Sequence, residues 1–216
     1  MSLQIERYLK PTALIDSDNT YIQEKAKALT AEHEDVIQHA RSLFYFVRDS
    51  IKYNMYVPIS RSEHFRASNI LAQGEGYCVQ KAILLVALGR AAGIPSGLGF
   101  ATLRNNILSN KAMRRLGTNI LNFHGYARLY LNGRWFKATP TFDLGMCESY
   151  GIIPVEFDGE NDAVFHSHNK EGELHIEYLK DLKRNYRDVP LETIWKKMIQ
   201  TYGKRILEPP KRHTKG

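Results

Sequence analysis

The amino-acid sequence predicts an α+β fold, with helices in the first half of the chain and an antiparallel sheet in the second. Apolar residues recur at three- and four-residue steps over residues 36–53, which is the spacing of an amphipathic helix. Residues 79–92 are rich in Ala and Leu and apolar nearly all round, so they predict a central buried helix that packs on the sheet. Alternating runs on both sides of Asn132-Gly133 predict a β-hairpin with a two-residue turn.

Local signals define the elements in chain order. Residues 1–15 predict only a short strand or an extended arm, whereas the polar residues 16–20 can cap a first helix. Gly93 and Pro95 end the buried helix. The predicted helices cover residues 21–29, 36–53, 79–92 and 191–202, and the predicted strands cover 97–103, 124–131, 134–141 and 175–179. A polar connection over 104–122, with a helical turn near 111–116, separates the first strand from the hairpin.

The length and composition fit one domain. With 216 residues, of which 43% are hydrophobic, the chain can bury a sizeable core. We predict a single domain over residues 1–207, with its core at about 36–145, and a basic, disordered tail over 208–216. Neither a basic leader nor an apolar run of membrane-spanning length occurs, so the sequence predicts a cytoplasmic protein without membrane contact.

The net charge of +7 is carried by the end of the chain. From Lys180 onward there are eleven Lys and Arg against four Asp and Glu, and the signs balance before that point. A short basic end is more often solvated than specific for nucleic acid, so we do not expect nucleic acid as a partner. Two cysteines, Cys78 and Cys147, are too few for a disulfide framework, and we predict that both are thiols.

Cys78 is the strongest candidate for chemistry. It follows the glycine-rich turn at 74–76 and stands at the start of the buried helix. The unpaired N–H groups and the positive dipole end of a helix lower the pKa of a thiol, which favours a nucleophile. The alternative is that Cys78 is an inert, buried cysteine. Lys81, on the first helical turn, is expected at the surface.

The hairpin supplies a second candidate. A two-residue turn at 132 and 133 pairs residues whose numbers add to 265, so His124 lies opposite Thr141. If the second strand continues, His124, Thr139 and Asp143 share one face, with Asp143 one diagonal step from His124. A cysteine, a histidine that accepts its proton and a carboxylate that holds the imidazole are the parts of a thiol acyl-transfer site. Cys78, His124 and Asp143 are therefore the predicted triad.

These motifs carry a family resemblance. Gly-Tyr-Cys-Val-Gln-Lys-Ala at 76–82, His-Gly-Tyr at 124–126 and Asn-Gly-Arg-Trp-Phe-Lys-Ala-Thr-Pro-Thr-Phe-Asp at 132–143 resemble the core of the transglutaminase-like superfamily. The similarity spans about 36–145, and later segments resemble its bacterial and archaeal members. The resemblance implies a papain-like α+β fold and a Cys-His-Asp triad without a metal. It also implies an activity among cysteine proteases, amide hydrolases or protein-crosslinking enzymes, with Cys78 as the nucleophile and His124 as the general base.

The third triad position departs from the family pattern. In many members the acid directly precedes a Pro-Thr pair, and here Thr139 holds that place. We prefer Asp143, because a carboxylate can stabilise an imidazolium whereas a threonine cannot supply charge. Oxyanion stabilisation would come from the Cys78 N–H and a side chain, for which Gln73 and Tyr77 are candidates. Thr139 is retained as a further residue that can contact the substrate.

The sequence thus predicts a cysteine-dependent acyl-transfer enzyme that acts on peptide or protein amides through a thioester. Hydrolysis of a protease or amidase type is preferred, and protein-glutamine amine transfer is the alternative. A binding domain that retains the fold without turnover is a third possibility, favoured by Thr139. No cofactor and no metal are expected, and the sequence does not indicate the oligomeric state.

Overall fold

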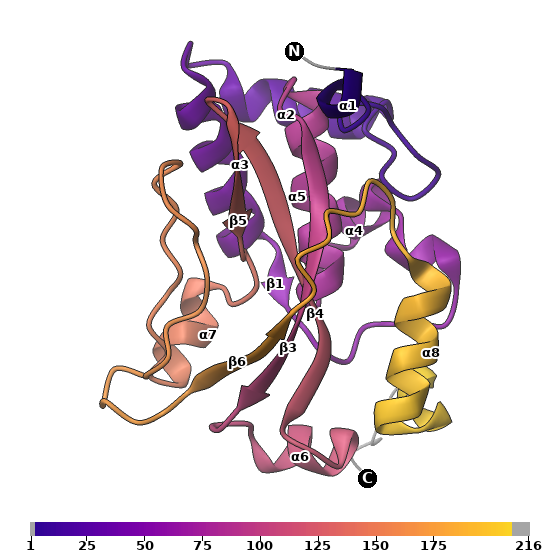
Figure 1. Cartoon of the computed structure of the whole chain (residues 1–216), viewed down its shortest axis with the longest axis vertical. Helices are drawn as coiled ribbons and strands as arrows, with labels where there is room; N and C mark the ends of the chain where they lie inside the picture. Colours follow the sequence, from indigo (N-terminus) through magenta and orange to yellow (C-terminus); the bar gives the residue numbers. More distant parts are fainter. Residues whose placement is uncertain (1–2, 209–216) are drawn as a thin grey trace, which may run out of the picture.

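A computed structural model describes residues 3–208, and Figure 1 gives its layout. The helices are α1 (Leu3–Glu6), α2 (Thr20–Thr30), α3 (Val36–Ser50), α4 (Ala67–Gln73), α5 (Cys78–Ala91), α6 (Asn110–Leu116), α7 (Leu144–Ser149) and α8 (Leu191–Tyr202), with 3₁₀ turns η1 (Ser62–Phe65) and η2 (Lys204–Leu207). The strands are β1 (Lys52–Tyr53), β2 (Glu75–Gly76), β3 (Ser96–Asn105), β4 (Ile120–Leu131), β5 (Arg134–Ala138) and β6 (Ile176–Asp181). The α+β prediction is confirmed. Residues 209–216, most of the predicted tail, lie outside the described part.

The main sheet has the order β5-β4-β3-β6 with antiparallel neighbours. Its hairpin has the predicted register, since Ala127 pairs with Ala138 and Leu131 with Arg134. The strand β5 nevertheless ends at Ala138, before Pro140, which has no N–H to donate to a ladder. The strand predicted over 134–141 therefore ends three residues early, and its conditional continuation to residue 143 is absent.

The helix α5 is the centre of the core. All residues from Val79 to Arg90 are buried, in agreement with the predicted apolar helix. It packs along β4 on one side and against α2, α3 and α4 on the other, as Figure 1 shows. The same amphipathic spacing that predicts α3 gives its buried face, which carries Leu43, Phe44 and Val47.

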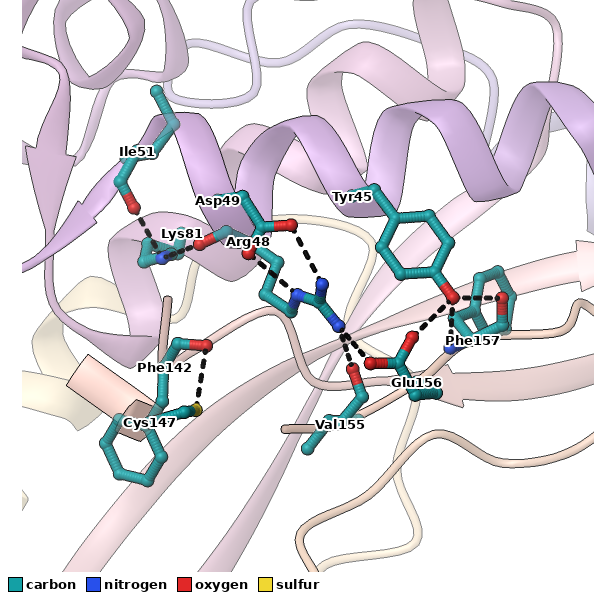
Figure 2. Close-up of polar contacts among 10 residues, drawn as sticks. All are labelled: Tyr45, Arg48, Asp49, Ile51, Lys81, Phe142, Cys147, Val155, Glu156 and Phe157. Atoms are coloured by element: carbon teal, nitrogen blue, oxygen red, sulfur yellow. Dashed lines mark hydrogen bonds and ion pairs between the residues drawn. The ribbon is translucent and has the colours of Figure 1, made fainter. Parts of the chain in front are cut away.

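The expectation that Lys81 lies at the surface is wrong, because its side chain is 0% exposed. Its Nζ donates hydrogen bonds to the carbonyl oxygens of Arg48, at 3.0 Å, and Ile51, at 2.5 Å (Figure 2). Carbonyl groups at the C-terminal end of a helix lack partners within the helix, and Lys81 satisfies two at the end of α3. Burial lowers the pKa of Lys81 to about 7.

The buried guanidinium of Arg48 fixes the outer side of α3. Arg48 forms ion pairs with Asp49, at 2.9 Å, and with Glu156, at 2.8 Å, and donates to the carbonyl oxygen of Val155 (Figure 2). The hydroxyl of Tyr45 also donates to Glu156, at 2.8 Å. These contacts attach the irregular segment after α7 to the helical half. No helix within residues 3–208 is both long and apolar enough to cross a membrane.

Candidate active site

Cys78 is the first residue of α5, as predicted, and both cysteines are free thiols. The backbone N–H groups of Gly125, Val79 and Cys78 itself act to lower the pKa of its thiol. Burial acts in the opposite direction and is the larger effect, so the pKa of Cys78 rises to about 11. The prediction of a lowered thiol pKa is therefore wrong.

A close contact between β4 and α5 brings His124 to the cysteine. A side-chain carbon at Gly125 would lie only 2.9 Å from the Cα atom of Val79, so only glycine allows this approach. His124 immediately precedes Gly125, and Cys78 immediately precedes Val79. Consequently Cys78 and His124 line the same small cavity, of about 70 Å³.

The His124 imidazole is enclosed by apolar groups. His124 is 3% exposed, and its ring contacts the Phe165 ring at a centroid distance of 5.0 Å. Its Nε2 atom is sealed and has no hydrogen-bond partner among the described residues. Burial lowers the pKa of His124 to about 3, so the ring is neutral at physiological pH. A neutral imidazole can accept the proton of a thiol.

Asp143 lies elsewhere. Its Oδ1 accepts from the N–H of Met146, at 3.0 Å, and so caps α7, while its Oδ2 accepts from the N–H of Tyr53, at 2.8 Å. Within residues 3–208 no hydrogen bond joins Asp143 to His124, so the contact expected between them is absent. The physical reason is the early end of β5, which leaves Asp143 at the N-cap of α7 and not on a strand beside His124.

Thr139 is buried directly after the end of β5. Extension of the observed register by one residue places it opposite Tyr126, on the face that carries His124. Its N–H donates to the carbonyl oxygen of Ala163, at 2.9 Å, and its hydroxyl is sealed without a partner in the described chain. The same contact with Ala163 directs the following residues, including Phe165, over His124.

The two oxyanion candidates have different surroundings. Gln73 is exposed at the end of α4 and lines neither the small cavity nor the groove beside it. Tyr77 lines the cavity of Cys78, but its hydroxyl is sealed and unpartnered among the described residues. Sequence reasoning did not select Tyr53, which also lines this cavity, or Phe165. Only their aromatic character was visible in the sequence.

The C-terminal elements cover the site. Side chains from α8 and the following turn line the cavity of Cys78, namely Ile194, Met198, Tyr202 and Ile206. The indole N–H of Trp195 donates to the carbonyl oxygen of Ile59, at 2.7 Å. The Tyr202 hydroxyl accepts from the N–H of Asn122, at 2.9 Å, and donates to the carbonyl oxygen of Ile120, at 3.1 Å. The cover is thus attached on both sides.

A larger groove of about 480 Å³ adjoins the small cavity. The two share four lining residues, which are Tyr53, Met55, Leu116 and Leu121. Lys52, Lys111 and His175 also line the groove. No group of three or more His, Cys, Asp and Glu side chains within residues 3–208 is arranged to hold a metal ion.

Comparison with known sequences gives one family. The family model described as "Transglutaminase-like superfamily" matches residues 23–140, which include Cys78, His124 and Thr139. No curated protein matches the chain.

Comparison with solved structures gives one that supports the fold. The "Putative Cysteine Protease" from Cytophaga hutchinsonii is similar, with a TM-score of 0.51 and 22% identity over 65% of this chain and 43% of that one. The periplasmic domain of TgpA from Pseudomonas aeruginosa gives a TM-score of 0.45 and 17% identity over 65% of this chain and 48% of its own. The chain therefore spans less than half of each of these two structures.

Proposed function

The chain belongs to the transglutaminase-like superfamily, and from this premise we propose that it is a cysteine-dependent acyl-transfer enzyme that acts on amide bonds. The observation that supports this most directly is the placement of Cys78, at the start of a buried helix, in one cavity with His124. The preferred reaction is hydrolysis of a peptide or protein amide, since water is always present as an acceptor.

The proposed reaction starts from two neutral groups. His124 takes the thiol proton as the Cys78 sulfur attacks the amide carbon, and the resulting imidazolium gives that proton to the departing amine. Water then adds to the thioester, and its proton returns through His124 to the sulfur as the acid leaves. The N–H of Cys78 faces its own sulfur and is suited to receive the carbonyl oxygen. No cofactor takes part in these steps.

The absence of a carboxylate at His124 within the described chain changes how the imidazolium is stabilised. The Phe165 ring lies 5.0 Å from the imidazole, and the negative face of an aromatic ring attracts a cation. The Thr139 hydroxyl is buried on the face of the hairpin that carries His124 and makes no hydrogen bond in the described structure. We infer that Phe165 and Thr139 take the place of the usual acid, with a smaller electrostatic contribution.

The groove beside the cavity supports a peptide or protein as the substrate. Because it meets the cavity of Cys78 along Tyr53 and Leu116, an extended chain in the groove would present an amide to the sulfur. Amine transfer shares every step up to the thioester, so a lysine side chain is the alternative acceptor.

A binding domain without turnover remains the second candidate. The raised pKa of Cys78 and the helix α8 over the cavity favour it. The test is acylation by p-nitrophenyl acetate, followed by mass spectrometry of the intact protein and of its peptides. The enzyme hypothesis predicts an adduct on Cys78 that hydroxylamine removes, and none in Cys78→Ala. Cys147→Ala is the matched control and should acylate normally. If Cys78 remains free of acyl groups at every pH while the protein stays folded, the binding domain is the better conclusion.

A further inference from the structure

Tyr53 is attached by its backbone to the segment that leads to the nucleophile. It lies in β1, which runs parallel to β2, and its partner is Gly76, two residues before Cys78. Two hydrogen bonds flank this pair. The N–H of Lys52 donates to the carbonyl oxygen of Gly74, at 2.9 Å, and the N–H of Asn54 donates to the carbonyl oxygen of Gly76, at 3.0 Å. The position of Tyr53 relative to Cys78 is therefore set by a short ladder and does not depend on a flexible loop.

The side chain of Tyr53 reaches the site. It lines both the Cys78 cavity and the larger groove, and its ring packs edge-on against Phe142 at a centroid distance of 5.0 Å. Its hydroxyl makes no hydrogen bond with any described residue, although it is not one of the polar atoms that the fold seals from solvent. Burial, and to a smaller degree a charge on Cys78, raise the pKa of this hydroxyl, so it stays protonated and can donate.

Two other tyrosines line the same cavity and differ from Tyr53. The Tyr202 hydroxyl is already engaged with the backbone of Ile120 and Asn122. The Tyr77 hydroxyl is sealed. Among the three, only the Tyr53 hydroxyl is both unoccupied in the described structure and open to the cavity.

Asp143 holds Tyr53 in place. One carboxylate oxygen accepts from the Tyr53 N–H, at 2.8 Å, and the other caps α7 through Met146. Both oxygens accept from backbone donors, so the side chain ties the strand β1 to the start of α7. This contact explains why a carboxylate lies near the site without touching His124.

From this arrangement we propose that Tyr53 is a catalytic residue whose hydroxyl donates a hydrogen bond to the substrate carbonyl oxygen, and that Asp143 is its positioning residue. The proposal rests on the proposed function. As the Cys78 sulfur bonds to the carbonyl carbon, the carbon–oxygen double bond becomes single and the oxygen gains negative charge. The Tyr53 O–H and the Cys78 N–H stabilise that charge without transferring a proton.

The test compares two reactions of the same sulfur. Acylation by p-nitrophenyl acetate passes through an oxyanion, whereas alkylation by iodoacetamide displaces iodide and forms none. In Tyr53→Phe, acylation of Cys78 should fall about 100-fold while alkylation stays within about twofold of the wild type. Tyr130→Phe is the matched control, because it removes a tyrosine hydroxyl from β4 at a position that lines neither the cavity nor the groove, and both of its rates should be unchanged.

The role of Asp143 is tested by a double variant. Asn can accept only one of the two backbone hydrogen bonds well, so Asp143→Asn should slow acylation about tenfold and leave alkylation nearly unchanged. Combined with Tyr53→Phe, it should add little, because both changes act on one hydrogen bond. A fully additive loss overturns the role of Asp143 as a positioning residue for Tyr53.

Equal losses in both reactions, or no loss in either, overturn the role of Tyr53. A wild-type protein that is alkylated but never acylated at Cys78 overturns the proposed function, and the role of Tyr53 with it. The reactivity of the wild-type protein alone therefore distinguishes a failure of the proposed function from a failure of the role of Tyr53.

Discussion

Replacement of Lys81 by Met should remove a pH dependence of folding that this one buried amine creates. Its pKa falls from 10.5 to about 7 in the folded protein, because burial disfavours the charged form. Between these values the unfolded chain binds a proton that the folded protein does not, so the free energy of unfolding increases with pH. From pH 7 to pH 9 the contribution of Lys81 works out to about 2 kcal/mol.

The measurement is urea unfolding at pH 7, 8 and 9, followed by tryptophan fluorescence, in the wild type and in Lys81→Met. The two cysteines with raised pKa values begin to lower stability as the pH rises through the unfolded thiol pKa of about 8.5, but they are present in both proteins, so their effect cancels in the comparison. The wild type should gain about 2 kcal/mol relative to the variant over this range. Lys52→Met changes an exposed lysine nearby and should retain the wild-type slope. If the free energy of unfolding changes with pH in the same way in the wild type and in Lys81→Met, the conclusion that Lys81 is a buried, neutral amine is refuted.

Three further predictions concern the site. Alkylation of Cys78 by iodoacetamide should become faster up to a pH of about 11, without a plateau near neutrality. His124→Ala should leave this pH profile unchanged, because the imidazole is neutral. A plateau near pH 7 that His124→Ala abolishes would contradict the prediction. Gly125→Ala should destabilise the protein by about 1–3 kcal/mol in thermal unfolding, because the added carbon would lie 2.9 Å from the α5 backbone. Gly145→Ala is the control and should leave the stability nearly unchanged, because its added carbon has a nearest contact of 3.4 Å. Tyr202→Phe removes two hydrogen bonds that join α8 to the backbone of β4, and it should accelerate alkylation of Cys78 about tenfold. The rate is measured by peptide mass spectrometry. An unchanged rate would show that α8 does not control the access of the reagent to Cys78.

The parts of the fold that the sequence predicts are those decided by neighbouring residues. Asn132-Gly133 fixes a two-residue turn, and a two-residue turn fixes the register of both strands by arithmetic alone. The end of β5 is different. Thr139 and Thr141 continue the alternation, but Thr139 uses its N–H on Ala163, a residue 24 positions later in the chain. A pattern of neighbouring residues cannot show that this N–H bonds to a carbonyl so far along the chain.

The same distinction separates the site residues. Cys78 and His124 follow from a helix start and a strand register, both of which are local. The hydrogen bond of Asp143 joins residues 90 positions apart, and the carbonyl partners of Lys81 lie 30 and 33 positions away. A charged residue on a predicted helix is assigned to the surface unless such partners are known, and the partners become visible only in three dimensions.

The thiol pKa illustrates how a distant element reverses a local argument. The helix start stabilises a thiolate at Cys78 through nearby N–H groups, as the sequence predicts. The helix α8, more than 100 residues later, lines the cavity of that sulfur and reduces the contact with water that would solvate its charge. Since His124 is buried in the same cavity, the resting pair carries no charge, and charge separation has to occur together with attack on the substrate. Under the proposed function, groups that stabilise charge only at that stage should therefore affect the rate far more than groups that would stabilise a resting ion pair. The donor proposed at Tyr53 belongs to the first kind, whereas a carboxylate at His124 would belong to the second.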